Sequence, residues 1–173
     1  MGLFKKTLLA SFFLLAIVAN TSAQKYAFVD TKYILSKMDS YTEAQKKLDD
    51  IAEKWMKEIE AKYKEIEDKK TKFQQESILL PADEKNKKLA EIKQLEEEVR
   101  ELQKKRFGVN GDLFKKRKEL IEPIQEEIYK AIKALAKEKG YDFIMDKSAN
   151  SNILFTNPKY DKSEQVLKKI KKK

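Results

Sequence analysis

Residues 48–73 read LDDIAEKWMKEIEAKYKEIEDKKTKF, and residues 89–102 read LAEIKQLEEEVREL. In both stretches apolar residues recur every three or four positions among lysines and glutamates, which places them on one face of a helix. The segment Leu79-Leu80-Pro81 separates the stretches, and a proline disfavours helix at the residue before it. Because each helix has one narrow apolar face, the two faces are expected to pack on each other. The pattern predicts a long antiparallel helical hairpin within residues 41–140, with its tip near residues 79–83.

A turn centred on Leu80 and Pro81 also predicts which residues face each other. The expected neighbours are Phe73 beside Lys88 and Leu89, Ile66 beside Leu95, Ile59 beside Leu102, Trp55 beside Arg106 and Phe107, Leu48 beside Leu113, and Tyr41 beside Leu120. Apolar residues meet apolar residues at nearly every position, which supports the hairpin.

The composition is typical of long exposed helices. Charged residues make up 39% of the 173 residues, with only four Gly and three Pro, whereas roughly 25% charged residues is usual. The chain has no Cys and no His, which removes thiol nucleophiles, disulfides, His general bases and the commoner metal ligands. Neighbouring carboxylates on a helix point away from one another, so Glu96-Glu97-Glu98 predicts no catalytic pair. We expect neither an enzyme nor a bound cofactor or metal.

Residues 1–23 have the pattern of a secretory signal peptide. Lys5 and Lys6 precede an apolar run over residues 8–19, and Thr21-Ser22-Ala23 ends in small residues. The run is shorter than the roughly 20 residues that span a bilayer. Cleavage lowers Lys plus Arg from 38 to 36 against 29 Asp plus Glu, a net charge of +7. An exported basic protein is expected to attract anionic chains, lipid head groups or lipopolysaccharide, and not nucleic acid.

The two ends of the remaining chain predict a small sheet. Residues 25–30, 141–146 and 152–156 are rich in strand-forming residues, and Gly140 should end the helix before the second of them. We expect a short helix over residues 31–37, a cap from Asp39, Ser40 or Thr42 for the first long helix, and a last helix capped by Asp161 or Ser163. So few strand residues make too small a core to stand alone, so we expect oligomerisation to complete the sheet.

Three positions interrupt the helical pattern of the return arm. Gly108 and Gly111 lie three residues apart, and each costs about 1 kcal/mol relative to Ala in a helix. They predict a hinge or local kink; the alternative is two tolerated glycines in a continuous helix. Pro123 removes a backbone hydrogen bond and predicts a bend, where an arm would join a body.

Candidate binding residues cluster at the tip and further along the return arm. Ile78, Leu79 and Leu80 are apolar residues at an exposed turn, and they either contact a client protein or cap the apolar interface, with the cap favoured. The lysines expected near the tip as client contacts are Lys69, Lys70, Lys72, Lys85, Lys87 and Lys88. Lys115, Lys116, Arg117 and Lys118 are candidates for anionic lipid. The alternative for both basic groups is an ordinary solvated helix face.

The order of these features resembles the Skp/OmpH family of periplasmic chaperones. The resemblance rests on the signal peptide, the strand at residues 25–30, the charged hairpin, the segment LIEPI at residues 120–124, and GYDFIMD at residues 140–146. It covers essentially the whole chain after residue 23. It implies an ATP-independent holdase in which a trimer holds unfolded outer-membrane proteins between helical arms.

The resemblance also implies a division of the chain. The fold class is α+β: a helical hairpin arm over residues 41–119 projects from a β-rich trimer body over residues 24–40 and 120–173. The residues implied to build that body are Phe28, Val29, Phe143, Ile144, Leu154 and Phe155. The main competing hypothesis is a rigid coiled-coil spacer or tether of the cell envelope, which would bind one folded partner. A basic nucleic-acid binder is the third hypothesis, which export of the protein would argue against.

Overall fold

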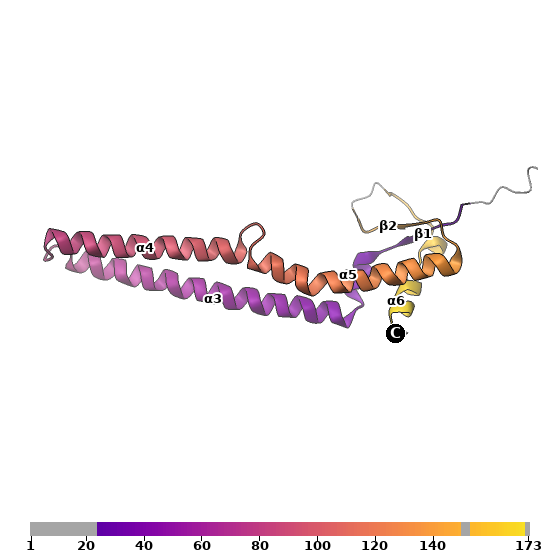
Figure 1. Cartoon of the computed structure of the whole chain (residues 1–173), viewed down its shortest axis with the longest axis horizontal. Coiled ribbons are helices and arrows are strands. Elements are labelled where there is room, and N and C mark those ends of the chain that lie inside the picture. Colours follow the sequence, from indigo (N-terminus) through magenta and orange to yellow (C-terminus); the bar gives the residue numbers. More distant parts are fainter. Residues whose placement is uncertain (1–23, 150–152, 172–173) are drawn as a thin grey trace, which may run out of the picture. The chain divides into compact units, whose positions relative to one another are not determined.

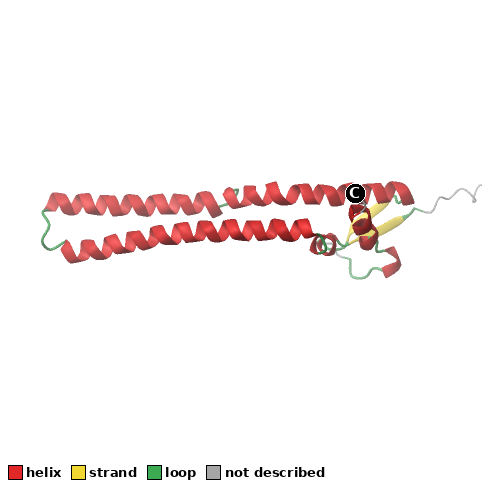
Figure 2. Cartoon of the chain, turned by 90° about the horizontal axis from the view of Figure 1, so that it is seen from below, coloured by secondary structure: helices red, strands yellow, loops and turns green. Residues whose placement is uncertain are grey.

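The computed structural model describes residues 24–149 and 153–171, so the expected signal peptide lies outside the described residues. The elements in chain order are β1 (Tyr26–Val29), α2 (Thr31–Ser36), α3 (Asp39–Glu76), α4 (Ala82–Phe107), α5 (Asp112–Lys139), β2 (Phe143–Asp146), η1 (Pro158–Tyr160) and α6 (Ser163–Lys171) (Figures 1 and 2). Long helices and a small sheet make an α+β protein, as expected from the sequence.

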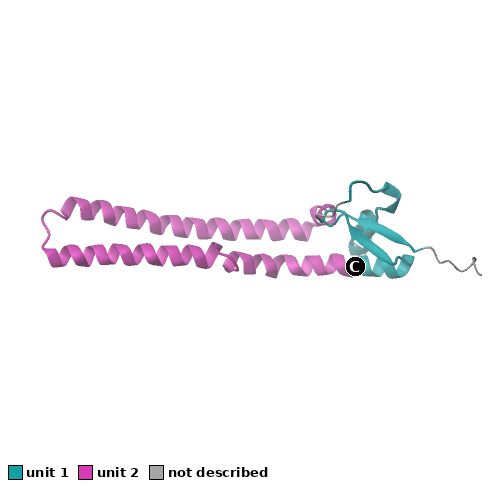
Figure 3. Ribbon diagram, turned by 90° about the horizontal axis from the view of Figure 1, so that it is seen from above, with its two compact units in different colours: residues 1–31, 131–173 teal, residues 32–130 magenta. Residues whose placement is uncertain are grey.

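The chain forms two compact units, which are coloured separately in Figure 3. One unit combines the described residues up to Thr31 with those from Ala131 onward, and it contains β1, β2, η1 and α6. The other unit is residues 32–130, and it contains the helical hairpin.

The hairpin consists of α3 and α4, which run antiparallel to each other (Figure 2). Its core contains the buried residues Ile59, Ile66, Ile92 and Val99, with Phe73, Leu95, Leu102 and Phe107 packed against them. The predicted register is confirmed at the positions of Phe73 and Trp55. Phe73 and Lys88 line one cavity, and Trp55 contacts both Arg106 and Phe107. The alternation of three and four residues between apolar positions thus placed the interface correctly.

Helix α3 starts earlier than the capping residues suggested. Met38 holds the N-cap position, and no described side chain caps this helix end. The predicted cap from Asp39, Ser40 or Thr42 is therefore wrong. Met38 is 6% exposed, and burial of its side chain outweighs the hydrogen bond that a polar cap would supply. Asp39 instead lies in the first turn, where a negative charge is favourable.

Residues 77–81 connect α3 to α4, close to the predicted tip. Pro81 is the N-cap of α4 in an extended conformation, with φ −60° and ψ 154°, and Asp83 and Glu84 occupy the first turn. Carboxylates in a first turn interact favourably with the free N–H groups and the helix dipole. The proline therefore directs the chain into α4, after α3 has already ended at Glu76.

The return arm is two helices. α4 ends at Phe107 and α5 begins at Asp112, so the alternative of one continuous helix through the two glycines is wrong. A Cβ at Gly108 would lie 2.3 Å from the carbonyl oxygen of Lys104, a distance that only glycine avoids. Pro123 lies inside α5, which continues to Lys139. Gly140, with φ +66°, ends that helix as predicted.

The sheet has two parallel strands among the described residues. Tyr26 pairs with Phe143 and Val29 with Asp146 in register. The expected strand at residues 152–156 is wrong for its described part, because residues 153–157 have no strand pairing. Asp161 and Lys162 pair with the free edge of β1 instead. Asp161 forms a parallel bridge with Phe28, and the N–H of Lys162 donates to the carbonyl of Phe28 at 2.8 Å.

Helix α6 follows this bridge directly. Asp161 accepts hydrogen bonds from the backbone N–H of Ser163 at 2.9 Å and from its hydroxyl at 2.6 Å. Asp161 therefore accepts from the N–H of the first residue of α6, although it lies one position before the N-cap, the position that was predicted for it or for Ser163. Val166 and Leu167 are then buried at 0% and 5% exposure, so α6 closes one side of its unit.

Candidate functional site

The turn of the hairpin presents two aliphatic side chains to solvent. Ile78 is 87% exposed and Leu79 is 88% exposed, while Leu80 is half-buried. The favoured interpretation of these residues as a cap on the apolar interface is wrong for Ile78 and Leu79. Helix α3 ends at Glu76, and the turn carries both side chains beyond Phe73, the last aromatic residue of the hairpin core. Ile78 and Leu79 therefore form an exposed apolar patch at the end of the hairpin.

Half of the lysines predicted at the tip are tied to carboxylates of the hairpin. Lys69 pairs with Glu91 and Lys70 with Glu96 at 2.6 Å, and Lys88 pairs with Glu76 at 2.8 Å. The hydrogen bond that Lys69 donates to Glu91 raises the pKa of Lys69, and the one that Lys70 donates to Glu96 raises the pKa of Lys70. Each is a solvent-exposed pair between α3 and α4, so water screens it, and it helps mainly to align the two helices. Their charges are not freely available to a ligand.

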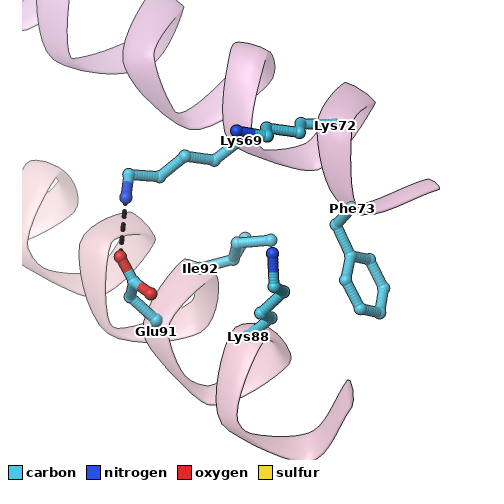
Figure 4. Close-up of a pocket in the computed structure, with 6 residues that line it drawn as sticks. All are labelled: Lys69, Lys72, Phe73, Lys88, Glu91 and Ile92. Carbon is cyan, nitrogen blue, oxygen red and sulfur yellow. Dashed lines mark hydrogen bonds and ion pairs between the residues drawn. The ribbon is translucent and has the colours of Figure 1, made fainter. Parts of the chain in front are cut away.

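The remaining three tip lysines have a different environment. Lys72, Lys85 and Lys87 have no ion pair within the part of the chain that the structure describes. Lys72 lies with Phe73 beside a cavity of about 210 Å³ between α3 and α4 (Figure 4). Its other lining residues are Lys69, Lys88, Glu91 and Ile92. Unpaired positive charge therefore remains close to the exposed turn.

A groove on the side of the hairpin was not predicted. Its volume is about 530 Å³, and it is lined by Met56, Ile59, Glu60, Tyr63, Gln103 and Phe107. Met56 is 61% exposed and Tyr63 is 45% exposed, and the Tyr63 hydroxyl donates to Gln103 Oε1 at 3.1 Å. A mobile thioether and an aromatic ring make an adaptable apolar surface. The spacing of three and then four residues between Met56, Ile59 and Tyr63 is the sequence signal that could have revealed this groove.

The second basic cluster is dispersed around α5. Lys116 pairs with Glu119 at 2.7 Å and Lys118 with Glu122 at 3.5 Å. Consecutive helix residues point in different directions, so the sequence KKRK at residues 115–118 does not make one patch. Arg117 and Lys118 line a groove of about 420 Å³ formed by α2, α3 and α5. Its other lining residues are Leu35, Tyr41, Gln45, Phe114, Ile121, Glu122 and Gln125.

The two-stranded sheet has one open apolar face. Because the strands are parallel and in register, Tyr26, Phe28, Phe143 and Met145 lie on the same face. Phe143 is 58% exposed and Met145 is 40% exposed, whereas Ala27 and Val29 on the opposite face are 0% and 1% exposed. The residues that the resemblance implies as trimer contacts therefore lie on two different faces of the sheet. Phe28 and Phe143 are on the open face, and Val29 and Ile144 are on the covered one.

Leu154 and Phe155 complete the set that the resemblance implied. They are 100% and 80% exposed in the segment before η1. Two large apolar side chains without cover are unusual in a small unit. Together with the open sheet face, they leave this unit with much uncovered apolar surface.

Polar contacts secure the ends of the sheet strands. Asp146 accepts hydrogen bonds from the hydroxyl of Thr31 at 2.5 Å and from the backbone N–H of Ser148 at 2.9 Å. Burial would raise the pKa of Asp146, but these hydrogen bonds outweigh it and hold the pKa below its usual value. Burial would also raise the pKa of Asp161. The ion pair with Lys147, 2.8 Å away, and the hydrogen bonds from Ser163 outweigh burial and lower this pKa.

Metal-ligand clusters and membrane-spanning helices are both absent from the described residues. Within the described residues, no group of three or more metal-ligating side chains lies close enough together to hold an ion. None of the described helices combines the length and the apolar character that crossing a membrane requires.

Comparison with known proteins gives consistent matches over nearly the whole chain. The family model described as outer membrane protein (OmpH-like) matches residues 25–170. A protein of Aquifex aeolicus of no stated function is 32% identical, over 93% of this chain and 95% of its own length. The chaperone protein Skp of Yersinia enterocolitica is 26% identical, over 96% and 99% of the two chains.

A solved structure matches the fold. A crystal structure described as an OmpH-like outer membrane chaperone from Caulobacter crescentus has a TM-score of 0.72, covering 87% of this chain and 86% of that one. Its sequence identity is 9%, so the likeness concerns the fold alone.

Proposed function

We propose that the chain, which belongs to the OmpH-like family, is an ATP-independent holdase that keeps unfolded outer-membrane proteins from aggregating. A chaperone role comes with the family, which includes the Skp chaperone of Yersinia enterocolitica. The holdase mechanism, the clients and the assembly described below are our proposal.

The observation that carries the proposal is the exposed apolar surface of an otherwise charged hairpin. Ile78 and Leu79 at the turn and Met56 and Tyr63 at the side groove are all exposed. An unfolded outer-membrane strand alternates apolar and polar residues and must be kept from pairing with other strands. Several small, adaptable apolar contacts suit such a client better than one shaped pocket.

The charge of the hairpin supports the same function. Lys72, Lys85 and Lys87 near the turn supply positive charge that attracts acidic segments of a client and speeds encounter. The paired lysines Lys69, Lys70 and Lys88 serve mainly to align the two helices. Weak charge contacts and small apolar contacts permit release without ATP, because the client leaves when it folds or is passed to another protein.

Oligomerisation would supply several arms. A two-stranded sheet that leaves Tyr26, Phe143 and Met145 exposed on one face is too small to be stable alone. We propose that three copies cover these faces together with Leu154 and Phe155. Several hairpins acting on one client raise the overall affinity through a high effective concentration, even when each contact is weak.

The proposal places the protein in the periplasm, after export through a cleaved signal peptide. An anionic lipid or lipopolysaccharide surface would meet the second basic cluster through Lys115 and Arg117, whose neighbours Lys116 and Lys118 are ion-paired. The expected absence of enzyme activity, cofactor and nucleic-acid partner belongs to the same proposal.

Binding of two unrelated unfolded clients tests this function. Each outer-membrane protein is diluted from urea into the chain, and the complex is separated by gel filtration with light scattering. We expect a soluble complex with both clients and none with either client once it has folded. A rigid spacer would bind neither unfolded client, and that result would reject the holdase.

A further inference from the structure

The break between α4 and α5 has a defined geometry. The N–H of Gly108 donates to the carbonyl of Lys104 at 2.8 Å, and that of Gly111 donates to the carbonyl of Gly108 at 2.8 Å. Asn110 has φ 60°, in the left-handed region that few residues adopt readily. A Cβ at Gly111 would lie 2.8 Å from the carbonyl oxygen of Lys105. The break is therefore a specific turn that needs its glycines.

Arg106 connects three helices at this break. Its Nη1 donates to Asp112 Oδ2 at 2.8 Å, joining the last turn of α4 to the first turn of α5. Its Nη2 lies 3.8 Å from Glu58 Oε2 on α3. The side chains of Arg106 and Asp112 are each 24% exposed. This pair is better shielded from water than the other ion pairs of the hairpin described above.

The guanidinium also stacks on the tryptophan of α3. Its central carbon lies 4.6 Å from the centre of the Trp55 ring, a cation–π geometry. The Trp55 ring meets Phe107 edge to face, with centroids 6.3 Å apart. Trp55 is the only tryptophan in the sequence, so its fluorescence reports on this contact alone.

One atom of Arg106 makes opening of this contact easier. Its Nε is buried and has no hydrogen-bond partner among the described residues. A buried donor without a partner is unfavourable, and it gains a water molecule when the side chain moves out. Val109 in the break is 98% exposed, so its side chain does not oppose movement. The conformation of the break thus depends on the ion pair and the stacking contact of Arg106, and water can hydrate the guanidinium when these contacts open.

We propose that Arg106 is the clasp of a joint at residues 108–111. In the closed position Arg106 lies on Trp55 and ties α4 to α5 through Asp112. In the open position it leaves both, and the angle between α4 and α5 changes at Gly108 and Gly111. The clasp is inferred from the contacts of Arg106 and does not depend on the proposed function.

The test combines tryptophan fluorescence with a distance measurement on the full chain. Because the sequence has no cysteine, Lys93→Cys in α4 and Lys115→Cys in α5 provide unique sites for spin labels on either side of the break. Asp112→Asn removes the anchor of Arg106 without touching Trp55. We expect acrylamide quenching of Trp55 to rise about twofold and the label distances to broaden.

The control is Glu119→Gln, which makes the same kind of charge change in the exposed pair with Lys116. It should alter neither readout. Circular dichroism checks that Asp112→Asn keeps its helix content. If it does not, Arg106→Lys, which keeps the charge and loses the planar stacking, is measured in its place. Quenching and distances equal to those of the control would overturn the clasp, whether or not the chain proves to be a chaperone.

Discussion

Tyr26 and Phe143 are partners in the register of the parallel strands, and the two residues are 41% and 58% exposed on the same face of the sheet. A face of this kind on a two-stranded sheet needs cover from another chain. We expect Phe143→Glu to convert the oligomer into monomers, because an ionised carboxylate is costly to bury in an apolar interface. Mass from light scattering measures the change.

The control for this variant is Ile78→Glu, which places the same charge on an exposed aliphatic position of the hairpin turn. It should leave the oligomer mass unchanged. If Phe143→Glu also keeps the mass of the parent, the open sheet face is not the interface.

The exposed turn predicts a loss of binding without a loss of stability. Replacing Ile78 and Leu79 together by Ser removes the exposed apolar patch at the turn. Client affinity should then fall about tenfold, which corresponds to about 1.4 kcal/mol. The melting temperature should not change, because the two side chains are 87% and 88% exposed. Titration against a fluorescently labelled unfolded client measures the affinity. Val109→Ser, at a position that is 98% exposed in the helix break, is the control and should bind as the parent does.

The hairpin core predicts a graded effect on stability. Ile66 is 4% exposed in the core with Ile59, Ile92 and Val99. Ile66→Ala should lower the free energy of unfolding by about 2–4 kcal/mol, the usual cost of such a cavity. Leu89→Ala, at a position that is 50% exposed, should cost less than about 1 kcal/mol. Urea denaturation followed by circular dichroism distinguishes them, and equal losses would argue against the observed interface.

The sheet unit should weaken in acid. The pKa values of Asp146 and Asp161 lie below the ordinary 3.8 in the folded protein. Their stabilising contribution is therefore complete above that value and is lost as the pH falls through the lowered folded pKa. Hydrogen exchange of the β1 amides, compared at about pH 5 and about pH 3, should show faster opening in acid.

Asp146→Asn supplies the comparison for that experiment. It removes one of the two carboxylates that titrate, so the pH dependence of β1 exchange should be smaller than in the parent. An unchanged slope would show that Asp146 does not couple its protonation to folding of the sheet.

The hairpin could be predicted because it follows from residue spacing along each helix and from one proline at the turn. The spacing of Ile59, Ile66, Ile92 and Val99 identifies one face on each helix, and Pro81 sets the turn, so the register follows. The break at Gly108 was one of two open alternatives. Choosing between them required knowing that a Cβ there would lie 2.3 Å from the carbonyl oxygen of Lys104.

The features that were missed depend on contacts far apart in the chain. The apolar sequence of residues 152–156 favours a strand, but the described part lacks a partner because Asp161 and Lys162 already use the edge of β1. Arg106 is one basic residue among many, and only the fold places it over Trp55 on the facing helix. Likewise, the groove beside Met56 and Tyr63 appears only when α4 supplies Gln103 and Phe107.

Aggregation of an unfolded outer-membrane barrel tests the central claim most directly. The barrel is diluted from urea into buffer with about three copies of this chain per client, the ratio at which several arms act on one client. Light scattering should stay near the level of buffer, and it should rise when Ile78 and Leu79 are both replaced by Ser. Scattering that climbs as fast with the parent chain as without it would contradict the holdase.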